Sequence, residues 1–153
     1  MVRKYGIELD ELKHPLMVEE ESYTYNNCRL SSPEKITEML NQCFHLGRKS
    51  EEYVYMLALD SKCNLLGAFE VAHGTISKCL LSGREIYQRA LLCGAVNIIL
   101  AHNHPSKCTS PSKDDFMTAE KIKKAGKLIG INMVDFIIIG GNNFLSFGDE
   151  KLL

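Results

Sequence analysis

The chain has 153 residues, of which 45% are hydrophobic and 24% charged, and its formal net charge at pH 7 is −1. This length suits one domain with a self-sufficient core, and the composition excludes disordered and fibrous proteins. The charge balance provides no overall field that would attract nucleic acid or a membrane surface. No two of the six cysteines have CxxC spacing, which argues against zinc-ribbon and thioredoxin-like proteins. Since no apolar leader or membrane span is visible, we expect a cytoplasmic protein with reduced thiols.

Residues 1–29 are expected to form a lead-in segment before a domain that covers residues 30–153. The charge run Glu19–Glu21 is typical of a solvated surface, and Pro15 opposes a continuous helix in this region. The segment could add a strand to the domain or act as an arm against a partner.

A first helix is expected from Ser32–Pro33, because Ser caps free N–H groups and Pro fits the first helical position. Its apolar residues follow the helical period, and Gly47 is a suitable end: Ile36, Met39, Leu40, Cys43 and Phe44. Residues 52–60 are rich in aromatic and apolar side chains and predict a strand. Residues 65–72 predict its antiparallel partner after a polar turn, and residues 76–81 predict a further short strand.

Ser82 and Glu85 fit a capping box, which predicts a helix over residues 83–93 that buries Ile86, Ala90 and Cys93. Residues 95–101 form an almost continuous apolar strand, as expected where both faces of a sheet are covered. A loop over 102–111 leads to a third helix from Ser112 to Gly130.

The inner face of this third helix is expected to comprise five residues: Phe116, Ala119, Ile122, Gly126 and Ile129. A strand at 131–139, a hairpin turn at 140–143 and a returning strand at 144–147 complete the chain. Helices interleaved with strands predict an α/β sandwich with a mixed sheet.

The stretch from His102 to Asp115 contains the candidate metal ligands of the sequence. His102 and His104, two residues apart at the end of a strand, can lie on one side of extended chain. Asp115 follows His104 after ten residues and can return from the first turn of the next helix. Zinc binds imidazole and carboxylate groups, and a catalytic zinc keeps its fourth position for water. Two neutral imidazoles and one carboxylate leave a positive charge that favours ionisation of that water.

A hydrolase site of this kind also needs a general base. Glu70, on a strand before the zinc segment, is the candidate; Glu85 is the other acid in range, but its expected capping role makes Glu70 the preferred choice. Ser112 could donate its hydroxyl to the oxyanion of a tetrahedral intermediate.

Other interpretations of these residues remain open. Ser112 and Asp115 by themselves fit a capping box, which is compatible with a ligand role for Asp115. Cys108 lies four residues after His104, and its thiolate would complete a rival ligand set of His102, His104 and Cys108. The lysines of the third helix form either a local basic patch or a solvated face: Lys121, Lys123, Lys124 and Lys127.

The string His102-Asn103-His104-Pro105-Ser106, followed by Pro111-Ser112 and Asp115, closely resembles the motif of the RadC-like JAB domain. That family belongs to the JAMM/MPN zinc metalloprotease group, and the resemblance covers roughly residues 30–150. It implies a three-layer α/β/α fold similar to that of cytidine deaminase. It also implies zinc on His102, His104 and Asp115, Glu70 as acid–base and Ser112 as oxyanion donor, in an enzyme that hydrolyses peptide or isopeptide bonds.

The sequence departs from the family pattern in three places. RadC proteins, which are labelled DNA-repair proteins, usually carry an N-terminal helix-hairpin-helix region, for which this chain is too short. The loop that often reads Ser-Gly-Asp-Pro is here Ser106-Lys107-Cys108-Thr109, which bears on substrate choice. Phe136 stands where the family often has His after the Asp.

Three hypotheses follow for the function. The first is a zinc-dependent metallopeptidase acting on a peptide or protein substrate. The second is a DNA-associated factor, such as a nuclease, which the charge balance does not support. The third is a non-catalytic JAB interaction module. A homo-oligomer could form through an exposed edge strand near the N-terminus, and no membrane partner is expected.

Overall fold

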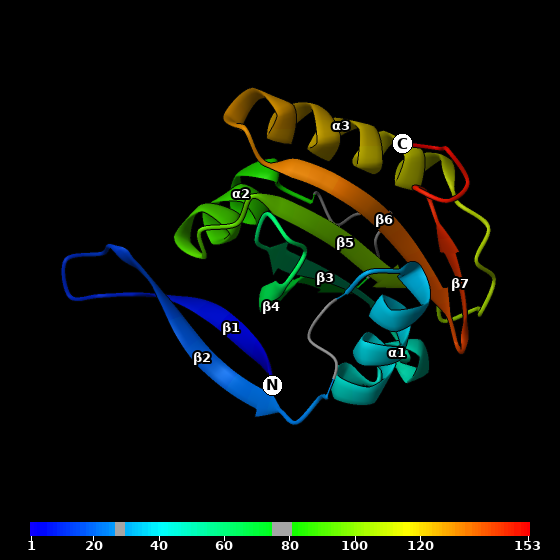
Figure 1. Cartoon of the computed structure of the whole chain (residues 1–153), viewed down its shortest axis with the longest axis horizontal. Helices are drawn as coiled ribbons and strands as arrows, with labels where there is room; N and C mark the ends of the chain where they lie inside the picture. The colour runs from blue at the N-terminus through cyan, green and yellow to red at the C-terminus, as the bar shows by residue number, and fades with distance from the viewer. Residues whose placement is uncertain (27–29, 75–80) are drawn as a thin grey trace.

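The computed structural model describes residues 1–26, 30–74 and 81–153. Its strands form one mixed seven-stranded sheet in the order β2-β1-β4-β3-β5-β6-β7, with helices on both faces (Figure 1). The expected three-layer α/β architecture is therefore confirmed. The elements follow the chain as β1 (Val2–Leu9), β2 (Pro15–Tyr23), α1 (Pro33–Phe44), the short 3-10 helix η1 (Leu46–Arg48), β3 (Glu52–Leu59), β4 (Leu65–Gly74), α2 (Gly83–Leu92), β5 (Asn97–Asn103), α3 (Lys113–Ile129), β6 (Asn132–Gly140) and β7 (Asn143–Ser146).

The centre of the sheet is formed by β3, β5 and β6. β3 pairs antiparallel with both β4 and β5, and β5 pairs parallel with β6. Because helices cover both faces, these strands read as continuous apolar runs. Alternate side chains enter two cores: Val54 and Ile98 belong to the core under α2 and α3, whereas Tyr55 and Ile99 belong to the core under α1.

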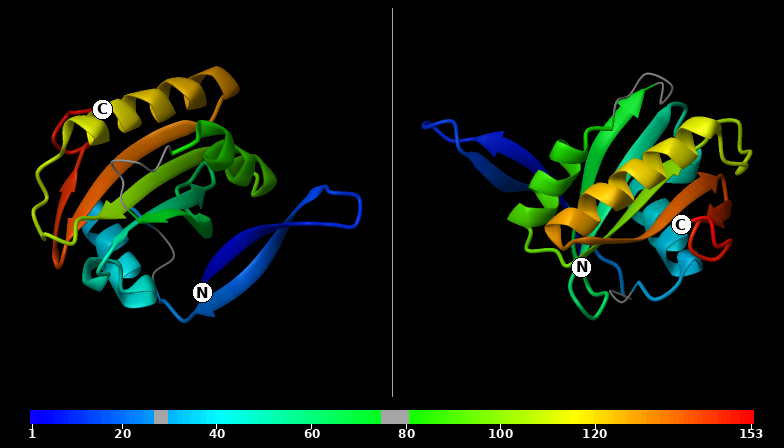
Figure 2. Two further views of the ribbon diagram at one scale, coloured as in Figure 1. Left: turned by 180° about the vertical axis from the view of Figure 1, so that it is seen from behind. Right: turned by 90° about the horizontal axis from the view of Figure 1, so that it is seen from above.

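The N-terminal segment is a β-hairpin. β1 pairs antiparallel with β2 and joins the sheet beside β4, where Lys4 lies opposite Ala68 in parallel register. The far end of the hairpin projects from the body of the molecule (Figure 2). Pro15 is the first residue of β2, which is the edge strand of the sheet. Proline lacks a backbone N–H, and at an edge strand this loss does not break the hydrogen bonding of a central strand. The segment therefore extends the sheet, which is one of the two expected arrangements.

One expected helix end and one expected capping contact differ from the structure. α1 ends at Phe44, because His45 takes a left-handed conformation (φ 53°) and its N–H bonds the carbonyls of Leu40 and Asn41. Gly47 lies instead in η1. Ser82 makes no side-chain capping bond at α2; Glu85, the other half of the expected capping box, contacts Arg84 and Arg89.

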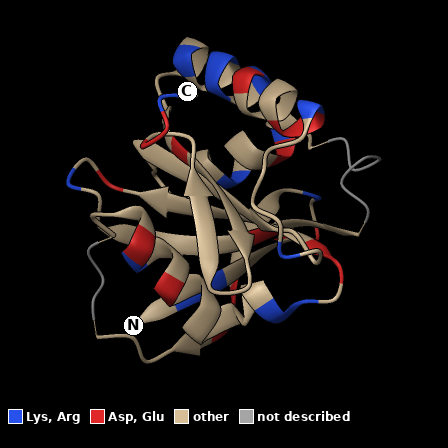
Figure 3. Ribbon diagram, turned by 90° about the vertical axis from the view of Figure 1, so that its right-hand side faces the viewer, with Lys and Arg blue, Asp and Glu red and all other residues tan. Residues whose placement is uncertain are grey.

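The third helix is capped as predicted, by Ser112 at its start and by Gly130 (φ 78°) after its end. Its buried face is narrower than expected, since Phe116 and Ile129 are 42% and 47% exposed. Lys121, Lys123, Lys124 and Lys127 are all exposed, and blue and red segments occur along the helix in Figure 3, as in a solvated face.

Three other expectations need comment. β5 extends through His102 and Asn103 rather than ending at Ala101. The short strand expected at 76–81 falls on residues 76–80, outside the described part of the chain, while Leu81 lies in no strand. Among the helices described, none is both long and apolar enough to cross a membrane.

Candidate metal centre

His102, His104 and Asp115 meet at the end of β5. His102 and Asp115 are almost completely buried, and His104 is partly buried. Nε2 of His102 lies 3.1 Å from Oδ1 of Asp115, and Nε2 of His104 lies 3.6 Å from Oδ2. The two Nε2 atoms are 3.0 Å apart. One ligand atom from each residue lies within 4.8 Å of the other two, so the three side chains could hold one metal ion.

The chemistry of this donor set fits zinc. Around one zinc ion with bonds of about 2.0–2.2 Å, tetrahedral ligand atoms lie roughly 3.2–3.6 Å apart. The two Nε2 atoms are 3.0 Å apart, and each has an Asp115 oxygen nearby, Oδ1 at 3.1 Å from His102 and Oδ2 at 3.6 Å from His104, which is near this range. Two imidazole nitrogens and a carboxylate oxygen are also common zinc ligands, with a fourth position left for water or substrate.

Two contacts orient the ligands. Nδ1 of His104 lies 2.7 Å from the carbonyl oxygen of Cys108; donation from Nδ1 leaves Nε2 free to bind a metal. Ser112 and Asp115 form the capping box of α3: the Ser112 N–H and hydroxyl both donate to Asp115 Oδ2, at 2.7 and 2.8 Å. One carboxylate therefore caps the helix and faces the histidines, so the two roles considered for Asp115 coexist.

The charges of this cluster are coupled. Burial opposes ionisation of Asp115, but hydrogen bonds with His102 and His104 outweigh it and hold the Asp115 pKa well below its usual range. The hydrogen bond with Asp115 raises the pKa of His104, against the effect of burial, and the Cys108 carbonyl adds to it. Without metal, the site therefore holds a carboxylate and a readily protonated imidazole, and a metal ion would replace that proton.

The thiol of Cys108 is not part of the cluster among the described residues. Cys108 is exposed, and it contributes its backbone carbonyl rather than its sulfur. The rival ligand set of His102, His104 and Cys108 is therefore not the one that the structure brings together.

The structure does not bring Glu70 to this cluster. Tyr55 of β3 pairs with Glu70 on one side and with Ala101 on the other, so Glu70 and Ala101 share a face of the sheet. Side chains alternate along a strand, which places His102 on the opposite face. Glu70 contacts the Tyr55 hydroxyl, Lys4 and His73 at 3.2, 3.6 and 3.4 Å. Its position does not support the expected role as general base.

The acid beside the histidines is Glu52, which was not predicted. Val54 pairs with His102 in regular antiparallel register, so Glu52, two residues earlier on β3, lies on the same face of the sheet as His102. The carboxylate of Glu52 contributes to the raised pKa of His104, and its side chain is partly buried. The pairing of β3 with β5 was the missing signal, since Glu52 opens the strand that lies next to the histidines.

Asn103, between the two histidines, faces the other side of β5. Its Oδ1 accepts the N–H of Tyr53 at 2.7 Å, and its Nδ2 donates to the carbonyls of Glu51 and Lys49 at 2.9 and 3.5 Å. Asn103 is 1% exposed. It therefore fixes the segment that carries Glu52 against the strand that carries the histidines.

A mixed α/β/α sheet with two histidines at a central strand end and a carboxylate in the next helix defines an α/β domain with a group of side chains that could hold one metal ion. Comparison with known families agrees: the RadC-like JAB domain matches residues 30–152, and the chain belongs to this family.

Curated relatives bear the name UPF0758 protein. The relative from Geotalea uraniireducens is 35% identical over 125 residues, which cover 82% of this chain and 54% of the relative. The relative from Thermotoga maritima is 32% identical over 124 residues, 76% of this chain and 56% of its own. The relative from Carboxydothermus hydrogenoformans is 35% identical over 127 residues, 83% and 55% respectively. The chain thus spans about half the length of these relatives, and their shared name states no activity.

Proposed function

We propose that this chain is a zinc-dependent hydrolase of the metallopeptidase type, which cleaves peptide or isopeptide bonds. The observation that carries the proposal is the convergence of His102, His104 and Asp115, with ligand atoms within 4.8 Å of one another, in a JAB domain. Zinc held there would polarise a carbonyl oxygen and make a water molecule more acidic.

The remaining groups have separate tasks in this proposal. Glu52, on the same face as the histidines, accepts a proton from the attacking water and returns it to the leaving amine. The Cys108 carbonyl fixes the ring of His104. Ser112 holds Asp115 through its hydroxyl, so we assign it a positioning role in place of oxyanion donation. Glu70, on the opposite face, takes no part.

The test compares wild type, Glu52→Gln and Glu70→Gln for zinc content and for hydrolysis of a quenched fluorescent peptide library. Wild type should contain one equivalent of zinc and should cleave some of the peptides. Glu52→Gln should keep the zinc and lose about 100-fold or more in kcat, as expected for a general base. Glu70→Gln should keep both zinc and activity.

His104→Ala serves as the metal-binding control in this comparison. Zinc at the background level in both wild type and His104→Ala would overturn the metal site. Full activity in Glu52→Gln with loss in Glu70→Gln would overturn the assignment of the base, whatever the zinc content.

A further inference from the structure

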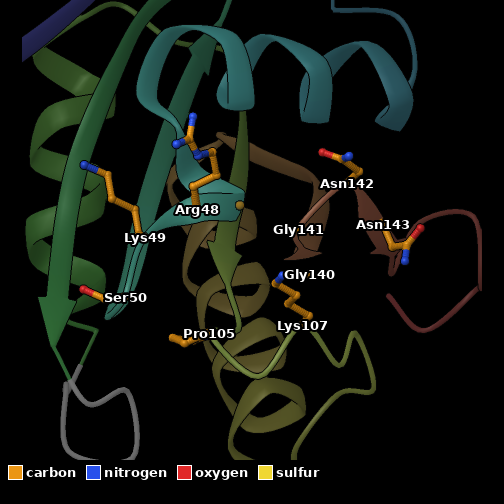
Figure 4. Close-up of a pocket in the computed structure, with 10 residues that line it drawn as sticks. Arg48, Lys49, Ser50, Pro105, Lys107, Gly140, Gly141, Asn142 and Asn143 are labelled. Carbon is orange, nitrogen blue, oxygen red and sulfur yellow. The ribbon is translucent and has the colours of Figure 1, made fainter.

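A cavity lies beside the candidate metal centre. Its volume is about 930 Å³, and three separate segments line it: residues 47–50, Pro105 with Lys107, and residues 140–143 (Figure 4). Pro105 directly follows the candidate ligand His104. The cavity is thus built on the same loop as the metal centre, and the proposed function leaves it unused.

The cavity is positively charged. Arg48, Lys49 and Lys107 contribute three cations from two of the segments, and no acidic residue is among the described residues that line it. Asn142 and Asn143 add side-chain amides. The net charge of the chain is −1, so this cavity has a local excess of positive charge and of hydrogen-bond donors. Both favour an anionic ligand.

The walls of the cavity are held together by close backbone contacts. A Cβ on Gly47 would lie 2.1 Å from the carbonyl oxygen of Gly141, and a Cβ on Gly140 would lie 2.3 Å from that of Lys107. The side chain of Asn41 donates to the Gly141 carbonyl and accepts the Gly47 N–H. The three segments therefore form a preorganised site, which spares a ligand part of the ordering cost of binding.

Lys107 has an unfavourable backbone conformation. Its φ of 63° lies in the left-handed region, where glycine is preferred over residues with a Cβ. Strained positions of this kind concentrate at ligand-binding sites. Glycine would occupy this position without strain. The contribution of the lysine side chain to the cavity is a reason for a lysine there instead.

The basic cavity adjoins a smaller cavity that is lined by Glu52. This smaller cavity, of about 320 Å³, is lined by Glu51, Glu52 and Gly74, and it shares Ser50 and Pro105 with the basic cavity. Glu52 is the proposed general base. A chain that extends across Ser50 and Pro105 would therefore reach from the three cations to the proposed reacting groups.

We infer that the basic cavity binds an acidic segment of a peptide, whose carboxylates contact Arg48, Lys49 and Lys107 while the neighbouring residues extend toward Glu52. The cavity is lined by no aromatic side chain among the described residues, whereas proteins that bind single-stranded nucleic acid combine positive charge with aromatic stacking platforms. This difference favours a peptide over nucleic acid. The direction toward a cleaved bond rests on the proposed function; the binding of the acidic segment does not.

The test measures binding rather than cleavage, so its failure is distinct from a failure of the proposed function. A fluorescently labelled peptide with consecutive glutamates is titrated by anisotropy into zinc-loaded wild type and into Glu52→Gln. The same peptide with glutamines, and an oligothymidylate of similar length, are the comparison probes. Both proteins should bind the glutamate peptide, and binding should be about tenfold or more weaker for the glutamine peptide.

Lys107→Gly removes one cation and relieves the backbone strain, so the variant should fold at least as well as wild type. It should weaken binding of the glutamate peptide about tenfold. Lys13→Gly is the matched control, because Lys13 is also an exposed lysine in the left-handed region (φ 65°) and lies at the hairpin between β1 and β2. Its affinity should equal that of wild type.

Equal binding of the glutamate and glutamine peptides, or equal losses in Lys107→Gly and Lys13→Gly, would overturn the inference. Preferred binding of the oligothymidylate, lost in Lys107→Gly, would assign the cavity to nucleic acid instead. Binding of the glutamate peptide without cleavage in any assay would support the assignment of the basic cavity and would overturn only the proposed peptidase activity.

Discussion

Ser112 acts on the metal centre without being a candidate ligand. Its hydroxyl accepts the N–H of Asp115 at 3.1 Å and donates to Asp115 Oδ2 at 2.8 Å. The first contact stabilises the start of α3, and the second sets the carboxylate against the histidines. One small side chain therefore couples helix capping to metal binding.

Replacing Ser112 by Ala should affect stability and metal affinity together. Loss of the N-cap costs about 1 kcal/mol of unfolding free energy, and release of Asp115 should weaken zinc binding about 10- to 100-fold. Urea unfolding of the metal-free protein and competition with a zinc chelator measure the two effects.

Ser32→Ala is the matched control, since Ser32 caps α1 through the Lys35 N–H on the other side of the sheet. It should lower stability and leave zinc affinity unchanged. A normal zinc affinity in Ser112→Ala would contradict the positioning role.

At this scale the sequence predicts the three side chains that the structure brings together, His102, His104 and Asp115, but it does not predict that Glu52 shares the face of His102. Two histidines that are two residues apart, and so on the same side of a strand, and an Asp in the first turn of a helix are local features. They can be recognised without knowledge of the strand order. The choice between Glu70 and Glu52 depends on which strand lies beside β5 and on which face each residue occupies. Both are properties of long-range pairing, and the register shift between β3 and β4 at Val54 and Tyr55 further disturbs simple alternation.

At the scale of elements, α2 and α3 pack through a buried tyrosine. The hydroxyl of Tyr87 donates to the carbonyl of Ile122 at 2.6 Å. A Cβ on Gly126 would lie 2.3 Å from the same hydroxyl oxygen, so glycine allows the two helices to approach. Burial raises the pKa of Tyr87 from its ordinary value of 10 to about 12.

Tyr87→Phe should lower the unfolding free energy near neutral pH by about 1 kcal/mol, because the hydrogen bond is lost. The raised pKa means that the folded state keeps the phenol proton longer than the unfolded state. The contribution of Tyr87 is complete below pH 10 and is lost as the pH rises toward 12.

Denaturant unfolding at a series of alkaline pH values checks this expectation. The difference in stability between wild type and Tyr87→Phe should shrink from pH 10 to pH 12. A difference that stays constant over this range would show that the hydroxyl does not titrate as the packing implies.

Helices were predictable where side-chain period and capping residues agreed, as in α3. The predicted end of α1 was wrong because a non-glycine residue, His45, takes the left-handed position. His45 ends α1 because its N–H finds carbonyls of the last turn, which composition does not reveal, and the nearby Gly47 is needed instead for its contact with Gly141.

At the scale of the molecule, zinc would contribute to the stability of the whole domain. Free zinc at 100 times its dissociation constant stabilises a folded protein by about 2.7 kcal/mol. For a chain of this size, that corresponds to a rise of roughly 5–10 °C in Tm. A chelator should therefore lower the Tm of wild type by this amount.

The same chelator should leave the Tm of His104→Ala unchanged, because that variant lacks a candidate ligand. Scanning calorimetry of the two proteins, with and without chelator, makes the comparison. An equal response of both proteins would place any stabilising metal outside the His102, His104 and Asp115 cluster.

The layered architecture could be predicted from the alternation of helical and strand patterns in the sequence. The strand order and the basic cavity could not be predicted in this way. The hairpin at residues 1–23 contains charged residues on both faces and gives no signal of where it joins the sheet. The cavity is assembled from segments near residues 48, 107 and 141, and only the folded chain brings these together.

The hydrogen bonds of Asn103 restrict which residues can replace it at position 103. Alternation in β5 turns the residue between the two histidines away from the metal and toward two backbone carbonyls and one N–H. Asp would set carboxylate oxygens against those carbonyls, Ser could not reach all three groups, and Leu would leave them unpaired in a buried place. The position thus has a very small set of permitted side chains, although its residue is not one of the candidate metal ligands.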